Sequence, residues 1–559
     1  MFVQVAPYYA AAQIAYMYEI GYVDGVCGSA SCLLFGCDQV ITSFDWETKT
    51  FTWVETQDCQ DKLRVSRETF VDLMLLSGLS TLPPIAQLLD EDSPIARVAA
   101  VRQILSHANG DGWTACLQLQ DEAYAENYMK QRTLLKHPIL ILGDGTVTPK
   151  DPENMPNDVH EFTSQRLPDE LIHYLARGVV GPRVLNARVR MELFETQPLD
   201  GGASPAYKEL VSEKLRPLRA QSLGLITRLL HRYYQKTDVD LVCWYNEANR
   251  RPLGVRELTE TSEAEKSWHV KPKDMPTVNG VKSLTAPLLF AVEALSEDAK
   301  SRGTVTPRKQ GTHSLVRGPE NILANSVWRF MHDRGYINND HTLSAWGKAL
   351  KASLDHAKGS GLMTPESGNE AEEAIFVAFE LLRLNILNSA SLFPTPPYTG
   401  APSRGTDADK ANTLLISRIA CLGTFGHSEI GYTGPLSRHL LAYHQMIAAV
   451  RGSLRDLAEM HACTLLLSGA VARDIKPNQL TELGAAIPFA REPDLGLALV
   501  VKSYLDELSN DPARRSDISR WFIHAKDIHQ DLEKAFKLWN AVCWFSRRGV
   551  NVGHYEMTC

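Results

Sequence analysis

The chain contains 559 residues, of which 44% are hydrophobic and 22% are charged, and its net charge is −8 with a pI near 6.1. This length allows three or more domains with separate cores, and the composition is that of an ordinary soluble protein. The acidic balance excludes the global basic character of dedicated nucleic-acid-binding proteins, so any RNA contact must be local or indirect.

The ten cysteines are scattered along the chain, without a C-x-x-C pair or a matching pair of histidines. This pattern favours reduced cysteines of an intracellular protein over zinc ligands, and we expect no metal or cofactor. No apolar run is long enough to span a membrane, and no basic leader precedes an apolar core. The sequence therefore predicts a protein of the cytoplasm or nucleus without membrane association.

Short helical and β-rich segments alternate over residues 1–110. The expected elements are a helix over 6–21 with Pro7 in its first turn, β-rich runs over 22–27 and 39–44, and a helix over 66–76. Alternation of this kind indicates an α/β three-layer domain. Residues 111–143 are expected to be helical, and residues 148–158 are rich in Pro, Asn and Asp. We therefore assign 111–158 to a helical connector and linker.

The rest of the chain is predicted to be predominantly α-helical. A second domain covers 159–300 and includes a helical stretch over 206–235, which is expected to break near Pro217. A basic, turn-rich linker over 301–319 leads to a third domain, 320–559. Within it, residues 327–350 predict two helices joined by a short extended turn, with Ser344 as a cap. This arrangement is winged-helix-like and serves in protein interaction as often as in reading nucleic acid.

One basic stretch of the second domain has two interpretations. It carries Lys214, Arg216, Arg219, Arg228 and Arg232, followed by Tyr233 and Tyr234. Basic groups interleaved with aromatic side chains could track an RNA backbone and stack on its bases. The pattern favours the alternative, a solvated amphipathic helix whose leucines (Leu223, Leu229 and Leu230) face the core.

The first eighty residues carry a recognisable pattern. Residues 5–15 read V-A-P-Y-Y-A-A-A-Q-I-A, residues 22–36 read Y-V-D-G-V-C-G-S-A-S-C-L-L-F-G, and residues 70–81 read F-V-D-L-M-L-L-S-G-L-S-T. This resembles the internal region of the XPG/FEN-type structure-specific nucleases, with its A-P-x-E-A-E-A, E-D-x-D-x-L-x-F-G and F-x-D-L-x-x-L-x-G-x-D-Y motifs. The scaffold positions match and the acidic positions do not. Where that family carries carboxylates, this chain has Tyr9, Ala11, Ser29, Ser31 and Ser80.

Loss of those carboxylates predicts loss of cleavage. Nucleases of this kind use paired Mg²⁺ ions, which require negatively charged oxygen ligands that a hydroxyl or methyl group cannot replace. Asp24 and Asp72 remain, but the matching positions of the family are not ligand positions, and Asp72 is expected to cap or to hydrogen-bond locally on its helix. The turn over 88–94 carries three acids and no glycine, which favours a helix start capped by Ser93, with Pro94 in its first turn, over a phosphate-binding hairpin.

The position of this pattern predicts a truncated domain. In the XPG/FEN family the A-P-x-E-A-E-A segment follows about a hundred residues that supply the first strands, whereas here it begins at Ala6. We therefore expect a partial three-layer domain whose first strands are missing, which would leave an exposed sheet edge.

Further segments extend the resemblance over most of the chain. They are residues 2–108, 167–186, 198–235, 328–350, 431–438 and 532–550. In this order they resemble the fungal killer-toxin-maintenance family of post-transcriptional regulators. The resemblance implies a non-catalytic cytoplasmic adaptor, found in messenger ribonucleoprotein granules, that affects translation or stability of mRNA. It also implies an ataxin-2-like partner that binds poly(A)-binding protein, with the C-terminal domain as the partner-binding region.

Two alternatives remain open from the residues alone. One is a working structure-specific endonuclease that acts on DNA or RNA, with its metal ligands supplied from elsewhere. The other is a nucleic-acid-binding module that acts through residues 328–350.

Overall fold

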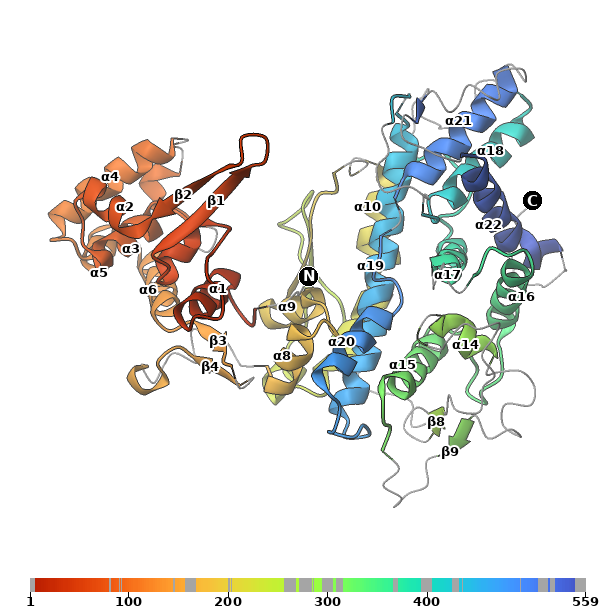
Figure 1. The fold of residues 1–559 in the computed structure, drawn as a ribbon, viewed down its shortest axis with the longest axis horizontal. Helices are drawn as coiled ribbons and strands as arrows, with labels where there is room; N and C mark the ends of the chain where they lie inside the picture. The colour runs from red at the N-terminus through yellow and green to blue at the C-terminus, as the bar shows by residue number, and fades with distance from the viewer. Residues whose placement is uncertain are drawn as a thin grey trace. The chain divides into compact units, whose positions relative to one another are not determined.

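The computed structural model describes residues 6–79, 82–89, 91, 93–143, 146–155, 167–199, 202, 204–255, 268–270, 284, 286–293, 305–307, 315–364, 370–393, 405–424, 432–434, 436–492, 494–510, 521–522 and 528–547. The chain forms two compact units, Met1–Ala176 (unit 1) and Arg177–Cys559 (unit 2). Helices dominate both units (Figure 1).

Unit 1 combines helices with two small antiparallel hairpins. Its elements are α1 (Ala10–Glu19), η1 (Ala30–Phe35), β1 (Gln39–Asp45), β2 (Thr50–Glu55), α2 (Thr56–Leu63), α3 (Arg67–Leu76), η2 (Ala86–Leu88), α4 (Pro94–His107), α5 (Gly112–Gln118), α6 (Glu122–Lys136), β3 (Ile139–Ile141), β4 (Val147–Pro149), η3 (Pro152–Asn154) and α8 (Asp169–Ala176). Strand β1 pairs with β2, and β3 pairs with β4.

The predicted α/β three-layer arrangement is wrong for the part of unit 1 that the structure describes. Its sheets have two strands each, and no parallel central sheet lies between helical layers. The predicted β-rich run over 22–27 contributes only an isolated bridge between Cys27 and Ile41. Helices α3–α6 instead bury their apolar faces against one another, around Leu73 and Tyr128. A helical core of this kind needs no sheet to cover it.

The predicted starts of the helices at Ser66 and Ser93 are confirmed, whereas the predicted start of the first helix is wrong. Ser66 caps α3 by accepting a hydrogen bond from the N–H of Thr69 at 3.2 Å, and Ser93 caps α4 with Pro94 in the first turn. The first helix begins at Ala10, so Pro7 lies outside it. Residues 112–136 form α5 and α6, which pack on α3 and belong to the core of the unit. The predicted linker begins with strand β4.

A glutamine ties the second hairpin to the first helix. The amide group of Gln13, 4% exposed, donates to the carbonyl of Ile141 at 3.0 Å and accepts from its N–H at 2.8 Å. The side chain thus makes the pair of bonds that a neighbouring strand would make. Both polar ends of a buried amide are satisfied, which fixes β3 against α1.

Unit 2 is larger and mostly helical. Its elements are α9 (Pro182–Arg190), β5 (Glu192–Glu195), α10 (Pro205–Glu209), η4 (Leu210–Lys214), α11 (Arg216–Thr227), α12 (Arg232–Lys236), β6 (Asp240–Cys243), β7 (Arg251–Pro252), β8 (Trp268–Val270), α14 (Pro287–Glu293), β9 (Val305–Pro307), α15 (Pro319–Asp333), α16 (Ala345–Gly359), α17 (Glu370–Arg383), α18 (Asp407–Ala420), α19 (Arg438–Leu467), α20 (Pro477–Ala486), α21 (Gly496–Asn510) and α22 (Ile528–Arg547). Strand β6 lies between β5, which is parallel to it, and β7, which is antiparallel.

The 30-residue helix α19 organises this unit (Figure 1). Helices α11, α15, α17 and α18 all contact it, and Leu454, Leu457 and Met460 in its second half are fully buried. Helix α11 comes from the segment predicted as a second domain and α19 from the third, so the described residues of these two segments from Arg177 onward pack together in one unit. The predicted linker over 301–319 contains β9, which pairs with β8. None of the described helices is both long and apolar enough to cross a membrane.

The predicted break near Pro217 takes the form of a π-helical turn. Residues Leu210–Lys214 form this wider turn, in which the N–H of Leu215 donates to the carbonyl of Leu210 at 2.9 Å. Proline has no N–H, and its ring collides with the carbonyl four residues earlier in a regular helix. The wider turn before Pro217 relieves that collision and sets the direction of α11.

The helix–turn–helix over 327–350 is confirmed, but its faces are occupied. Ser344 caps α16 by accepting from the N–H of Gly347 at 3.1 Å. Trp328, Phe330 and Met331 in α15 are fully buried, and α16 packs against α14, α17 and α22. The next element that the structure describes after α16 is the helix α17, so the described residues provide no wing. A helix enclosed in this way does not enter a DNA groove.

Candidate functional site

Two of the emptied carboxylate positions lie at the start of α1. The side chain of Tyr9 donates from its phenol to Oε1 of Gln131 at 3.2 Å, and its ring lies 5.9 Å from that of Phe35. Ala11 is half-buried and packs against a small core that includes Ala15 and Val26. Both positions therefore hold α1 against its neighbours by packing and by a neutral hydrogen bond.

Two further positions lie on η1, which packs against α1. The hydroxyl of Ser29 caps this turn, accepting from the N–H of Ser31 at 3.2 Å and from its hydroxyl at 2.9 Å. Where the nuclease pattern places two carboxylates, the two side chains thus bond to each other. The fifth position, Ser80, lies outside the described residues.

The chemistry of these four positions is neutral. A phenol, a methyl group and two hydroxyls supply no negative charge, whereas a Mg²⁺ pair requires several carboxylate oxygens to offset the loss of its hydration shell. Over the residues that the structure describes, no three His, Cys, Asp or Glu side chains converge in a way that could hold a metal ion.

Asp72, one of the two acids that remain in the pattern, is buried in a long-range network. It accepts from the phenol of Tyr128 at 2.8 Å and from the N–H of Gly112 at 3.4 Å, and it pairs with Nε of Arg132 at 2.6 Å. Burial raises the pKa of Asp72, and the Arg132 guanidinium opposes this shift. The expectation of local hydrogen bonding was wrong, because these partners lie on α5 and α6.

A cavity of about 350 Å³ opens at the start of α3. Arg64, Ser66, Thr69, Arg102 and Gly110 are among its lining residues. Two arginines near a helix N-terminus could attract an anion. However, the hydroxyl of Ser66 already accepts from the N–H of Thr69, and the hydroxyl of Thr69 donates to the carbonyl of Gly110 at 3.3 Å. Part of the donor set is therefore used within the protein.

The five basic residues proposed as RNA contacts do not form one surface. Arg219 has a side chain only 1% exposed, Lys214 pairs with Glu209 at 3.5 Å, and Arg216 donates to the carbonyl of Pro252. Of the two other residues, Arg228 is partly exposed and Arg232 is exposed, so both lie outside the buried core.

Their aromatic neighbours are separated as well. Tyr234 is 1% exposed beneath the guanidinium of Arg188, and Tyr233 is 40% exposed. The interpretation of an amphipathic helix is thus supported for Leu223 and Leu230, whereas Leu229 is exposed and lies outside the core.

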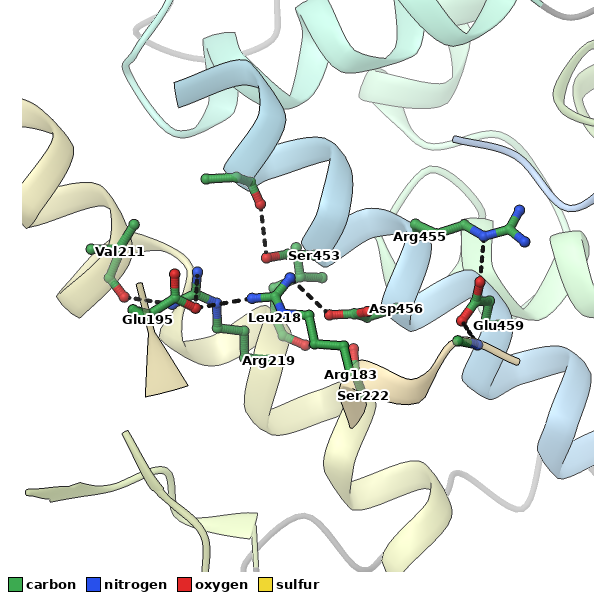
Figure 2. A network of polar contacts seen from close by, with 12 residues as sticks. Arg183, Glu195, Val211, Leu218, Arg219, Ser222, Ser453, Arg455, Asp456 and Glu459 are labelled. Carbon is green, nitrogen blue, oxygen red and sulfur yellow. Dashed lines mark hydrogen bonds and ion pairs between the residues drawn. The ribbon is translucent and has the colours of Figure 1, made fainter. Parts of the chain in front are cut away.

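Arg219 instead belongs to a buried ionic network of Arg219, Glu195, Arg183 and Asp456 (Figure 2). The side chain of Glu195 pairs with Arg219 at 2.8 Å and with Arg183 at 2.9 Å, and Arg183 reaches Asp456 at 3.1 Å. The four residues come from α11, β5, α9 and α19. Arg219 also donates to the carbonyl of Val211 at 2.7 Å.

The same helix carries a second ionic group. Glu459, one turn after Asp456, accepts from the N–H of Gly181 at 2.5 Å and pairs with Arg455 (Figure 2). Arg455 also donates to the carbonyl of Gly484 at 3.0 Å. Burial raises the pKa of Asp456 to about 6, against the pull of Arg183, and burial lowers the pKa of Arg219. The network holds four elements together from the inside.

Sequence reasoning missed this network, although a signal was present. Asp456 and Glu459 interrupt an apolar stretch of α19 at positions that should face the core. Charged side chains are buried only when they are paired, so such an interruption predicts basic partners from elsewhere in the chain. The identity of those partners, Arg183 and Arg219, depends on the fold.

The chain is similar to proteins of one family along most of its length. Two family models, both described as "Temperature dependent protein affecting M2 dsRNA replication", match residues 156–245 and 329–552. A third, the XPG I-region, matches residues 2–80. No solved structure matches the chain.

Curated relatives agree with these matches. The post-transcriptional regulator MKT1 of Cryptococcus neoformans var. grubii is 27% identical, over 96% of this chain and 74% of its own length. The Saccharomyces cerevisiae MKT1 is 23% identical over 84% of this chain and 64% of its own length. The Schizosaccharomyces pombe post-transcriptional regulator mkt1 is 23% identical over 96% of this chain and 71% of its own length.

Proposed function

Because the chain belongs to the MKT1 family of post-transcriptional regulators, we propose that it is a non-catalytic adaptor that controls the translation or stability of selected mRNAs. The observation that carries this proposal is the mutual hydrogen bond between Ser29 and Ser31, where the nuclease pattern requires two carboxylates. A nuclease-like region without anionic ligands keeps its surface but cannot bind the paired metal ions that cleavage requires.

The partner that we propose is an ataxin-2-like protein that binds poly(A)-binding protein, in the cytoplasm and its messenger ribonucleoprotein granules. The proposal places this contact on the C-terminal part of unit 2, within the segment 329–552. The net charge of −8 supports recruitment through protein contacts, because an acidic chain gains little from phosphate backbones.

A tethering experiment tests the adaptor function. The full chain is fused to an RNA-binding coat protein and directed to a reporter mRNA that carries the cognate hairpins. We expect a change in reporter protein or mRNA level relative to the coat protein alone. The change should disappear when the poly(A)-binding protein or the ataxin-2-like protein is depleted. A reporter that does not respond to the tethered chain would contradict the proposal.

The alternative, a structure-specific endonuclease, is tested directly. Purified full chain is incubated with flap and single-stranded DNA and RNA in the presence of Mg²⁺ or Mn²⁺. We expect no metal-dependent product above the level of the Ser29→Ala/Ser31→Ala variant. Turnover that depends on the metal and falls in that variant would replace the adaptor proposal with the nuclease.

A further inference from the structure

The β1–β2 hairpin of unit 1 exposes four aromatic side chains on one face. We call Phe44, Trp46, Phe51 and Trp53 the aromatic face. Their exposed fractions are 44%, 82%, 56% and 47%. Phe44 lies opposite Phe51 in the strand register, with ring centroids 6.3 Å apart, and Trp46 stacks on Phe44 at 5.3 Å. Trp53 follows Phe51 by two residues and shares its face.

The opposite face of the hairpin anchors it to the unit. Val40 is 1% exposed and lies opposite Val54, and both contact the small core around Ala15. The register therefore sends one set of apolar side chains inward and the aromatic face outward. The strands extend beyond the helices that surround their base (Figure 1). Contiguous exposed aromatic groups of this size mark an interaction site, because leaving them in water is unfavourable.

The segment that carries the aromatic face is acidic. The hairpin and the helix α2 that follows it, residues 39–63, carry five carboxylates and two lysines. The carboxylates are Asp45, Glu47, Glu55, Asp58 and Asp61, and the lysines are Lys49 and Lys62. Lys62 already lies 4.0 Å from Asp58 in an exposed pair. An RNA backbone would be repelled here, whereas lysine and arginine side chains would be attracted.

The hairpin also offers an unpaired edge. In the sheet that the structure describes, β2 pairs only with β1, while β1 additionally bonds through Ile41 to Val26 and Gly28. An edge strand presents N–H and C=O groups that can accept a further strand. A peptide added there would run beside Phe51 and Trp53, so its alternate side chains would contact the aromatic face.

We propose that the aromatic face and the β2 edge bind an extended apolar segment of a partner protein that is flanked by lysine or arginine. This site rests on the proposed adaptor function and adds a second contact, on unit 1. The aromatic groups supply buried area, the edge supplies backbone hydrogen bonds, and the five carboxylates select a basic partner over nucleic acid.

Binding of synthetic peptides tests the proposal with the full-length protein. The probe is a labelled peptide of about ten residues, the length of a long strand, with alternating Val and Thr at its centre and lysines at both ends. A second peptide has the same centre and glutamate ends, and a third probe is oligouridylate. We expect the Lys-flanked peptide to bind at least about tenfold more tightly than the other two, with an affinity that falls as salt is added.

Two variants separate the contributions of the aromatic face and the charge. The variant Phe44→Thr/Phe51→Thr/Trp53→Thr keeps strand-forming residues. It should lower the affinity for the Lys-flanked peptide by about tenfold or more. Glu47→Lys/Asp61→Lys, at exposed positions, should reverse the preference toward the Glu-flanked peptide. The matched control is Ile95→Gln, which removes another exposed apolar side chain of unit 1 and should bind as the wild type does.

Three results would overturn this site. They are equal binding of the two peptides, tighter binding of oligouridylate than of the Lys-flanked peptide, and unchanged binding by both hairpin variants. The tethered reporter keeps this outcome distinct from failure of the proposed function. An inactive wild-type chain contradicts the adaptor, whereas an active chain whose hairpin variants bind normally contradicts only the docking site.

Discussion

Single residues decide the chemistry at the emptied nuclease positions. Ser29 and Ser31 satisfy each other by a hydrogen bond at 2.9 Å, and Tyr9 bonds to Gln131. Each of these three polar side chains, which replace carboxylates at described positions, therefore has a neutral partner within unit 1. Asp72, an acid that the pattern retains, bonds to Arg132 and Tyr128 in the interior. The nuclease-like sequence pattern is therefore kept as a structural framework, and the charge of Asp72 stabilises the core of unit 1.

Gly112 is required by these bonds of Asp72. A Cβ atom at Gly112 would lie 2.1 Å from the phenol oxygen of Tyr128 and 2.9 Å from Cγ of Asp72. Gly112→Ala should destabilise unit 1 by about 2–3 kcal/mol, although alanine is favoured in helices by about 1 kcal/mol. Hydrogen exchange of α3 and α6 in the full chain should accelerate accordingly.

The control for this change is Gly25→Ala, where nothing lies within 4 Å of an added Cβ. It should leave exchange unchanged within about 0.5 kcal/mol. Equal protection in both variants would mean that the contacts around Asp72 do not constrain the core.

Arg219 and Arg232 separate a structural role from RNA contact. Arg219→Ala leaves part of a buried ionic network unpaired and should lower the free energy of unfolding by about 3 kcal/mol. Arg232→Ala, on the exposed side of α12, should change it by less than about 0.5 kcal/mol. Urea denaturation followed by circular dichroism measures both. A stable Arg219→Ala protein with weakened RNA association would restore the RNA interpretation.

Helix α19 shows what an element contributes beyond its own sequence. It contacts α11, which precedes residue 300, and α15 and α17, which follow it. The helix therefore joins these two parts of the sequence. Asp456 links it to Arg183, and Glu459 links it to Gly181, so polar bonds accompany the apolar packing. Buried ion pairs contribute little net stability but are damaging to break, so they fix one arrangement of the helices.

The raised pKa of Asp456 predicts a pH dependence. The pKa of Asp456 is about 6 in the folded chain, above the ordinary aspartate value of 3.8, so the folded state binds the proton more tightly. The contribution of Asp456 to stability is therefore greatest below pH 3.8 and is lost as the pH rises through about 6. Relative to Asp456→Asn, the wild type should lose on the order of 2–3 kcal/mol between about pH 4 and pH 7.

Chemical denaturation of both proteins across this range gives the difference directly. Asp407→Asn, which makes the same substitution at a fully exposed side chain, is the matched control. A difference between wild type and Asp456→Asn that stays constant with pH would show that Asp456 titrates normally.

The whole molecule is an acidic chain in two units, and its charge bears on its partners. A net charge of −8 and the acidic hairpin disfavour the release of counterions that drives RNA binding. The adaptor proposal therefore locates RNA contact in partner proteins. This argument concerns the full chain, since local basic groups such as Arg216 are engaged within the fold.

Two measurements on the full chain follow from this charge. Affinity for a single-stranded RNA at about 150 mM salt should be weaker than about 100 µM, the weak end of non-specific binding. The proteins recovered with the chain from cell extract should be retained after ribonuclease treatment. Loss of all of them after ribonuclease, together with tight RNA binding, would support direct RNA recognition.

The sequence alone determined the features that depend on residue chemistry or on near neighbours. The neutral residues at Tyr9, Ala11, Ser29 and Ser31 are readable without coordinates, since a hydroxyl has no charge in any fold. The caps at Ser93 and Ser344 are local hydrogen bonds between residues three apart, so the pattern predicted them correctly. The predominance of helix in the later segments follows from the same short-range periodicity.

Tertiary structure decided what depends on distant partners. The three-layer sheet did not form in the described part of unit 1, because strand pairing is set by contacts far apart in sequence and α3–α6 cover one another instead. Arg219 looked like a surface cation until Glu195 and Asp456 enclosed it. The exposure of Phe44 and Phe51 follows from the register of β1 against β2, which places the two side chains opposite each other on the outer face of the hairpin. Burial is a property of the neighbours that a side chain meets, and the sequence does not list them.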